Sequence, residues 1–307
     1  MKMKKTAFFL LLFFLLNAVN ASAYEFTKIN RLFSVLENDY VNETNLKNIA
    51  LTNLRFYNND SQAFLYENNN LIGIFELPRE NQNPVLWQEL LTSVLTTSAQ
   101  RSDKLGGRES ELETRILKTM ADNLDIYSRI DELPSAELDI RYDKRNNILY
   151  VRPTAFFEGI SQKIQTVVTA FPHNSGLIFD LRECRGGSFN EALRTADLFL
   201  DSTIIAYSQG KDNQKRYYTA TPGDILKGKP IAVLTGRTTA SAAELVAAAL
   251  SEQSRATLIG TRTYGKNSIQ STYRIKDRIL FLTSGHFYTP SGKSLEKDGL
   301  TPQICTG

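Results

Sequence analysis

Residues 238–250, TTASAAELVAAAL, place a hydroxyl-rich turn directly before a helix-forming run of alanines. Ser241 begins this run, so a helix dipole would lie behind its hydroxyl, and the N–H of Ala242 would point outward as an oxyanion donor. These are features of a serine nucleophile. The alternative is structural, because Ser241 followed by Glu244 fits a capping box, a common pattern ahead of an apolar helix. Taken alone, this segment favours capping, and Thr239 and Glu244 are assigned to local structure.

A hydroxyl nucleophile needs a base, and Lys266 in TRTYGKNSIQ is the candidate. A lysine can accept the proton when burial disfavours its ammonium form and lowers its pKa toward neutrality. Gln270 follows four residues later and would share one face with Lys266 in a strand-like segment. Without that context a lone lysine is a solvated surface charge. The two histidines, His173 and His286, show no Ser-His-Asp setting, although such a triad is recognised by geometry and not by spacing.

A third segment, DLRECRGG at residues 180–187, follows a run of apolar residues. Gly186 and Gly187 carry no Cβ, so their backbone N–H groups could approach a substrate carbonyl closely. The alternative for this pair is an ordinary Gly-Gly turn, and the segment by itself does not decide between the two.

The elements that would hold these segments belong to an α/β core, which we predict over residues 148–307. GLIFDL and PIAVLT are continuous apolar runs, typical of strands buried on both faces, and helical runs alternate with them. This order predicts parallel strands with catalytic loops at the strand ends.

Residues 24–131 are predicted to form a mostly helical N-terminal region, because apolar residues recur there at helical spacing. The Asn-rich stretch at 57–70 and the polar stretch at 96–107 are predicted loops. Residues 132–147 are polar and turn-rich, and we place a linker and the domain boundary there.

The N-terminus predicts export. Three early lysines, a short apolar run and an Ala-Ser-Ala site predict that residues 1–23 are a secretory signal peptide and that the protein is exported to the periplasm. The rest of the chain carries 33 basic and 33 acidic residues, so no positive surplus for nucleic-acid binding is present. An uncleaved anchor is the alternative, but the apolar run is shorter than the ~20 residues that a membrane span needs.

Two cysteines, Cys184 and Cys305, occur in the chain. In an exported protein they allow one disulfide or two buried thiols, and both alternatives stay open. Their spacing does not suggest a zinc site.

Together these segments resemble the C-terminal processing peptidases, also called tail-specific proteases. The nucleophile and base segments are similar to that family's S/T-A-S-A-S-E and G-K-x-x-x-Q motifs, with Ser241 and Lys266 at the family's separation of 25 residues. The stretches that carry the resemblance are TASAAE (239–244), YGKNSIQ (264–270), DLRECRGG (180–187), FYTPSGKSLEKDGLTPQI (287–304) and MADNLDIYSRI (120–130). The match reverses the preference for capping, since Ser241 can cap the helix and still attack.

The resemblance implies a crotonase-like, Clp-protease-like core and peptide hydrolysis through an acyl-enzyme. Ser241 would be the nucleophile, Lys266 the base and Gln270 its hydrogen-bonding partner. Backbone N–H groups of Ala242 and of Gly187 or Gly186 would form the oxyanion hole. No metal or organic cofactor is needed.

The chain departs from the family pattern in one respect that bears on substrates, which would be polypeptides. Too few residues lie between the MADNLDIYSRI segment and the first core strand for the family's usual PDZ domain. Capture would then depend on the groove, on the N-terminal region, on an adaptor protein or on a homo-oligomer. The rival interpretation is a non-catalytic peptide- or ligand-binding protein on the same fold, although a binder has no need for the base.

Overall fold

A computed structural model describes residues 28, 31–32, 35, 56–58, 62–67, 70–79, 84–101, 109–131, 140–145, 147–275 and 278–306. The predicted signal peptide, residues 1–23, lies outside these residues. Contacts divide the chain into two units, of which the first holds residues 1–38 and 43–126 and the second holds residues 39–42 and 127–307. No helix among the described residues is long and apolar enough to cross a membrane.

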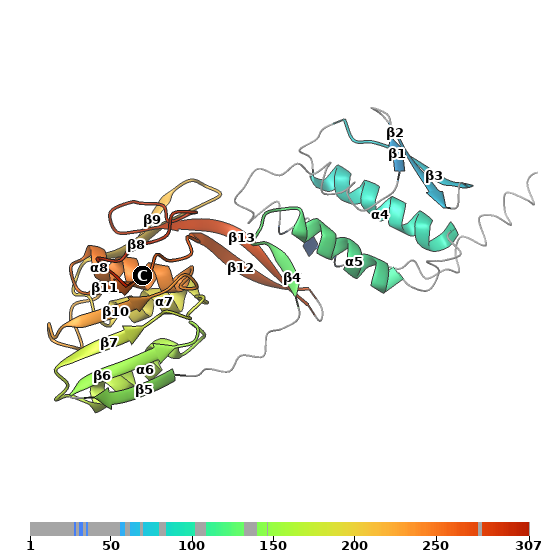
Figure 1. The fold of residues 1–307 in the computed structure, drawn as a ribbon. Helices are drawn as coiled ribbons and strands as arrows, with labels where there is room; N and C mark the ends of the chain where they lie inside the picture. The colour runs from blue at the N-terminus through green and yellow to red at the C-terminus, as the bar shows by residue number, and fades with distance from the viewer. Residues whose placement is uncertain are drawn as a thin grey trace, which may run out of the picture. The chain divides into compact units, whose positions relative to one another are not determined.

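Among the described residues, the first unit contains helices α4 and α5 and an antiparallel three-stranded sheet in the order β1-β2-β3 (Figure 1). The elements are β1 (Phe56–Asn58), β2 (Gln62–Glu67), β3 (Asn70–Glu76), α4 (Pro84–Arg101) and α5 (Glu109–Asp122).

Helices α4 and α5 confirm the helical character of this unit, but the loop prediction for residues 57–70 was wrong. Strand β2 lies within that stretch and buries Ala63 and Leu65 on alternate positions, the period of a half-buried strand. The surrounding asparagines hid this short alternation. The polar stretch after residue 96 was also misassigned in part, since α4 continues to Arg101.

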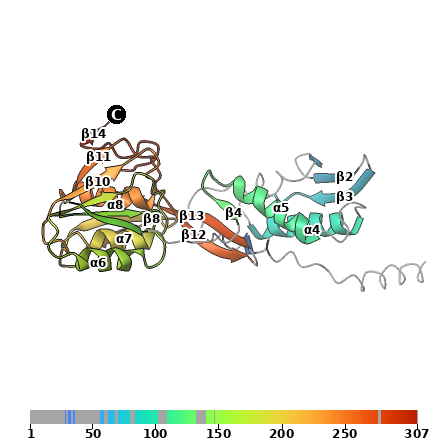
Figure 2. The ribbon, with the colours of Figure 1, turned by 60° about the horizontal axis from the view of Figure 1, so that its bottom comes forward.

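The second unit holds two sheets with helices packed against them (Figure 2). The six-stranded sheet has the order β14-β11-β10-β7-β6-β5, and all its pairings are parallel except that of β5 with β6. Its strands are β5 (Ile140–Arg145), β6 (Ile148–Pro153), β7 (Gly176–Asp180), β10 (Ile231–Thr235), β11 (Thr257–Gly260) and β14 (Ile304–Cys305). The predicted α/β core with parallel strands is confirmed.

The second sheet is antiparallel, with the order β12-β13-β8-β9 and with β4 also paired to β13. Its strands are β4 (Arg129–Asp131), β8 (Ile204–Gly210), β9 (Lys215–Thr219), β12 (Ser268–Ile275) and β13 (Arg278–Tyr288). In Figure 1, β12 and β13 lie side by side as a long ribbon with β4 beside β13.

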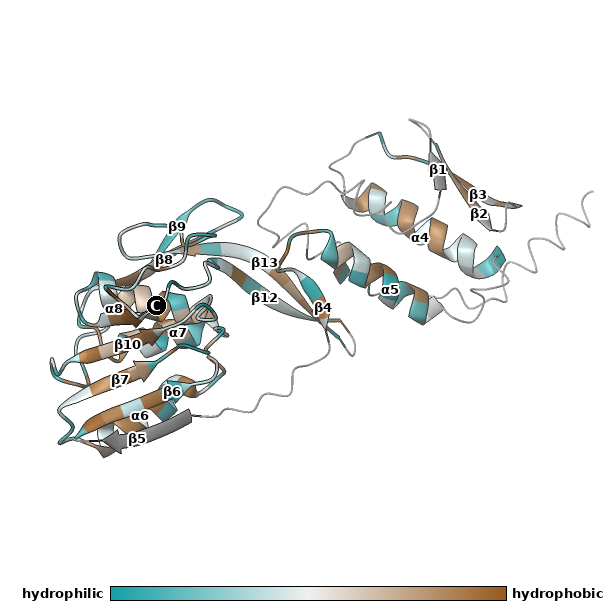
Figure 3. Cartoon of the chain, viewed as in Figure 1, coloured by the Kyte–Doolittle hydropathy of each residue, from teal (hydrophilic) through white to brown (hydrophobic). Residues whose placement is uncertain are grey.

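The core of this unit surrounds a small-residue helix. Helices α6 (Ile160–Ala170), α7 (Phe189–Asp197) and α8 (Ala242–Glu252) pack on one another, α6 against α7 and α7 against α8. Every residue of α8 from 242 to 250 is buried, and α8 contacts both β8 and β11, one strand from each sheet. Apart from Glu244, the buried residues of α8 are apolar, and its alanines permit close packing from every side. Figure 3 shows the apolar colouring of β7 and β10, which the continuous apolar runs predicted.

Two predicted boundaries were wrong. The linker placed at 132–147 includes β5, which extends the parallel sheet through an antiparallel pairing with β6. Residues 127–131, placed in the N-terminal region, belong to the second unit through the pairing of β4 with β13. Both strands are short and polar in sequence, so neither is recognised without its partner, which is the adjacent strand β6 for β5 and the distant strand β13 for β4.

Candidate active site

Ser241 occupies a strained turn between β10 and α8. Its backbone lies at φ 54° and ψ −118°, which residues with a side chain rarely adopt. Such a conformation costs on the order of 1–3 kcal/mol and persists only where neighbouring groups hold it. A sharp strand-to-helix turn presents the nucleophilic serine hydroxyl at the end of a sheet in α/β-hydrolases. The side chain of Ser241 is half-buried.

Glu244, in the first turn of α8, holds this conformation and also ties it to the base segment. Its carboxylate is fully buried and accepts four hydrogen bonds. One oxygen accepts the N–H groups of Ser241 at 2.8 Å and Lys266 at 2.9 Å. The other accepts the N–H of Gly265 at 2.8 Å and the hydroxyl of Thr263 at 2.5 Å. Burial raises the pKa of Glu244, and these four donors oppose that rise.

The structure brings Lys266 and Gln270 together, as the spacing predicted. The Nζ of Lys266 donates to Oε1 of Gln270 at 3.1 Å. Lys266 lies in the loop before β12, whereas Gln270 lies within it, where the pairing with β13 is irregular between Ile269 and Gln270. Such irregularities redirect side chains near functional sites.

Gly186 and Gly187 lie against the nucleophile turn. Gly186 has φ +95°, and a Cβ there would stand 2.6 Å from the carbonyl oxygen of Ala240 and 2.8 Å from the nitrogen of Ala242. Gly187 has φ +144°, and its Cβ would stand 2.3 Å from the carbonyl oxygen of Phe156. Both positions therefore require glycine, and the glycine loop passes beside the N–H of Ala242. An ordinary turn, in which either glycine could be replaced by another residue, does not fit these contacts.

A backbone hydrogen bond to Cys184 also joins the glycine loop to the nucleophile turn. The N–H of Ala240 donates to the carbonyl of Cys184 at 3.2 Å. Burial raises the pKa of the Cys184 thiol to about 11. Cys184 and Cys305 are free thiols, the first buried and the second exposed, so neither the disulfide nor the pair of buried thiols is found.

The comparisons with known proteins bear on this site as a whole. The model described as Peptidase family S41 matches residues 147–306. The chain belongs to peptidase family S41. The S41 segment contains the serine, lysine and glutamine segments and the glycine loop.

Relatives agree with the family. A carboxy-terminal-processing protease of Bartonella bacilliformis is 35% identical over 173 residues, 54% of this chain and 40% of that protein. The carboxy-terminal processing protease CtpA of Bacillus subtilis is 29% identical over 209 residues, 65% of this chain and 43% of that protein. The chain thus spans less than half the length of these relatives. The structure of a lipoprotein from Streptococcus agalactiae has a TM-score of 0.51 at 20% identity, covers 70% of this chain and 84% of its own, and shares the fold.

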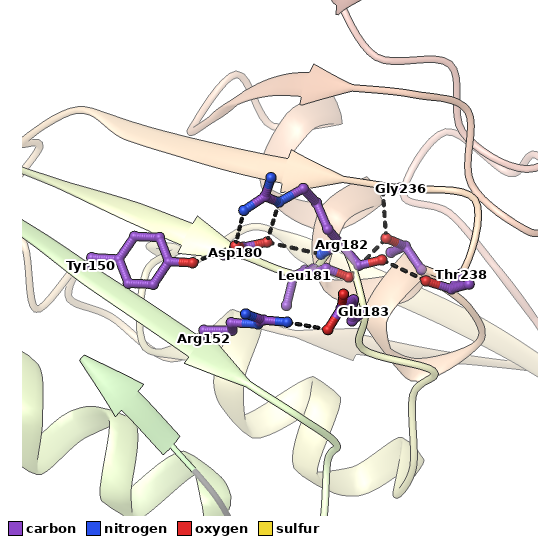
Figure 4. A network of polar contacts seen from close by, with 9 residues as sticks. Tyr150, Arg152, Asp180, Leu181, Arg182, Glu183, Gly236 and Thr238 are labelled. Atoms are coloured by element: carbon purple, nitrogen blue, oxygen red, sulfur yellow. Dashed lines mark hydrogen bonds and ion pairs between the residues drawn. The ribbon is translucent and has the colours of Figure 1, made fainter. Parts of the chain in front are cut away.

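A network behind the glycine loop of this S41 chain was not predicted (Figure 4). Asp180, at the end of β7, accepts three hydrogen bonds from Arg182 at 2.7–3.0 Å and one from the Tyr150 hydroxyl. Burial acts to raise the pKa of Asp180, but the hydrogen bonds from Arg182 and Tyr150 outweigh it and lower the pKa. The carbonyl of Arg182 accepts the Thr238 hydroxyl at 2.6 Å, so the network fastens the glycine loop to the nucleophile turn.

A second unpredicted member of the site is Tyr127. Its ring lies 4.5 Å from the Nζ of Lys266, and its carbonyl oxygen accepts the Nε2 of Gln270 at 2.5 Å. The stretch MADNLDIYSRI carried the family resemblance, but nothing in its sequence shows that Tyr127 reaches the base. The histidine alternative gains no support from His286, whose Nδ1 lies 3.4 Å from the Oδ1 of Asn267.

Proposed function

We propose that this chain is an exported serine endopeptidase that hydrolyses polypeptides through an acyl-enzyme formed on Ser241. The observation that carries the proposal is the single Glu244 oxygen that binds the N–H groups of both Ser241 and Lys266. A helix-capping role for Ser241 gives no reason for the capping carboxylate to hold a lysine loop as well.

In the proposed reaction, neutral Lys266 removes the proton of the Ser241 hydroxyl as Oγ attacks the scissile carbonyl carbon. The negative charge that develops on the carbonyl oxygen is stabilised by the N–H groups of Ala242 and of Gly187 or Gly186. The lysine ammonium then gives its proton to the leaving amine, which departs as the acyl-enzyme forms. A water molecule, activated by the same lysine, hydrolyses the ester and restores Ser241.

Gln270 supports the base in this scheme. Its Oε1 accepts from the Nζ of Lys266, which fixes where the amine stands. An amide oxygen in this role does not itself carry a proton, so Gln270 directs the lysine without replacing it.

An extended peptide pairing with a core strand would align substrate beside Ser241. Strand β12 begins two residues after Lys266 and lies at one end of the antiparallel sheet order. Such pairing reads the backbone more than side chains, so we expect broad preference and faster cleavage of unfolded chains.

The test is cleavage of an unfolded reporter protein by purified wild type, Ser241→Ala and Lys266→Ala, each shown by circular dichroism to be folded. The proposal expects cleavage by wild type alone. Binding of the reporter without cleavage would instead favour a binding protein. Export is tested separately by N-terminal sequencing, which should begin at Tyr24 in protein recovered outside the cytoplasm.

A further inference from the structure

We propose that Tyr127 is a positioning residue for the base, acting on Lys266 through its ring and on Gln270 through its carbonyl. This inference rests on the proposed function of the same site. Three contacts form a closed cycle: ring to Nζ at 4.5 Å, Nζ to Gln270 Oε1 at 3.1 Å, and Gln270 Nε2 to the Tyr127 carbonyl at 2.5 Å.

The carbonyl contact decides which end of the Gln270 amide faces the lysine. A carbonyl oxygen can only accept, so it takes the NH₂ end of the amide and leaves Oε1 toward Lys266. Oε1 then accepts a hydrogen from Nζ whether the lysine is neutral or charged. Tyr127 thereby prevents the amide from turning a donor toward the base.

The ring contact acts on the charge of the base. An aromatic face attracts an ammonium ion, and it attracts a neutral amine far less. The ring of Tyr127 therefore stabilises the ammonium that forms when Lys266 takes the proton of Ser241. It also makes deprotonation of the resting lysine require a higher pH than it would without the ring.

The backbone of Tyr127 is fixed well enough to serve in this way. Ser128 is buried, and its Oγ accepts the N–H of Thr283 at 3.1 Å. Strand β4 then pairs with β13 at residues 279–281, and β13 also pairs with β12, the strand that carries Gln270. Tyr127 and Gln270 are thus held by a common strand, although Tyr127 lies upstream of the S41 match at 147–306.

The experiment compares Tyr127→Phe, which keeps the ring, with Tyr127→Leu, which removes it, in the full chain. Tyr217→Leu, an exposed tyrosine on β9, is the matched control. The carboxylate of Glu244 remains on the Lys266 backbone in every variant, so its field is common to all of them. Folding of each variant is checked by circular dichroism and Tm.

We expect Tyr127→Leu to lower kcat about tenfold or more with KM within about threefold, because the ring acts in the transition state and not on substrate binding. Its kcat/KM should also reach the alkaline plateau at a pH about half a unit or more lower than that of Tyr127→Phe. Tyr127→Phe and Tyr217→Leu should match wild type within about twofold.

A direct titration makes the result independent of cleavage. The protein is labelled with isotopically enriched lysine, and the NMR signal of Lys266 is assigned by its loss in Lys266→Arg. The chemical shift of that signal is then followed against pH, and the midpoint of the titration gives the pKa of Lys266. A lower midpoint in Tyr127→Leu than in Tyr127→Phe supports the inference. Equal midpoints overturn it, even if Tyr127→Leu is slow, since slow turnover alone would be a packing effect. Failure of wild type to cleave any reporter would overturn the proposed function and leave this titration to decide the role of Tyr127.

Discussion

Ser241 and Lys266 donate their backbone N–H groups to the same oxygen of Glu244, at 2.8 and 2.9 Å. The two residues are 25 positions apart in sequence and lie in different loops. One buried carboxylate therefore sets the relative placement of the nucleophile turn and the base loop. Four hydrogen-bond donors offset the cost of burying the Glu244 carboxylate. Because these donors belong to the nucleophile turn and the base loop, loss of the charge should disturb the site more than the rest of the fold.

The first prediction concerns this carboxylate. Glu244→Gln keeps the shape but points an NH₂ group at two backbone or hydroxyl donors, so we expect kcat to fall at least about tenfold. Steady-state kinetics on an unfolded reporter measures it. Glu158→Gln, on a side chain that is 86% exposed, serves as control and should leave kcat unchanged. Wild-type kcat in Glu244→Gln would contradict the linking role.

Gly186→Ala is predicted to abolish cleavage, because the new Cβ would stand 2.6 Å from the Ala240 carbonyl and displace the glycine loop from the Ala242 N–H. Gly228→Ala separates this clash from backbone strain. Gly228 also has positive φ, at +77°, but a Cβ there would meet nothing within 4 Å. Rates and Tm are measured for both. The idea fails if the two variants lose the same activity.

Asp180 predicts a pH dependence of stability. Its pKa in the folded chain is lowered, so the carboxylate stabilises the fold above its unfolded pKa of about 3.9, and this contribution disappears as pH falls through the folded value. Asp180→Asn should thus lower the free energy of unfolding by about 1–3 kcal/mol at pH 7. Urea unfolding at pH 7 and pH 3 should show the difference from wild type shrinking at pH 3. A difference that is constant over this range would contradict the assignment.

The thiols give a prediction with three separable outcomes. Burial raises the pKa of Cys184 to about 11, whereas Cys305 is exposed. Iodoacetamide at pH 8 should therefore label one thiol in the native protein and two after unfolding, because thiolates are the reactive form. Mass spectrometry counts the labels. No label in either state would mean a disulfide, and two native labels would mean that Cys184 is accessible.

The sequence predicted the local parts of this site better than its long-range parts. Ser241, Lys266, Gln270 and the glycine pair lie in short motifs whose chemistry can be read from residue type and spacing. Tyr127 could not be found in that way, because its role depends on a β4–β13 pairing across some 150 residues. Glu244 was read as a helix cap, and only the folded loops reveal its second set of donors.

The same division holds for the fold. Apolar runs predicted the buried strands β7 and β10, because a strand that is covered on both faces is apolar along its whole length and can be recognised from its own sequence. Strands β2 and β5 were missed because they are short, polar at their ends and defined by pairing with neighbours. Their assignment depends on tertiary contacts that propensity does not encode.

The central claim is tested most directly by trapping the covalent intermediate. Wild type, Ser241→Ala and Lys266→Ala are each mixed with an activated peptide ester, quenched in acid within seconds and digested for mass spectrometry. The account predicts one acyl group on the peptide that contains Ser241 in wild type, none in Ser241→Ala, and at least about a hundredfold slower acylation in Lys266→Ala. Acylation of another residue in wild type, or equal acylation of Ser241 with and without Lys266, would contradict it.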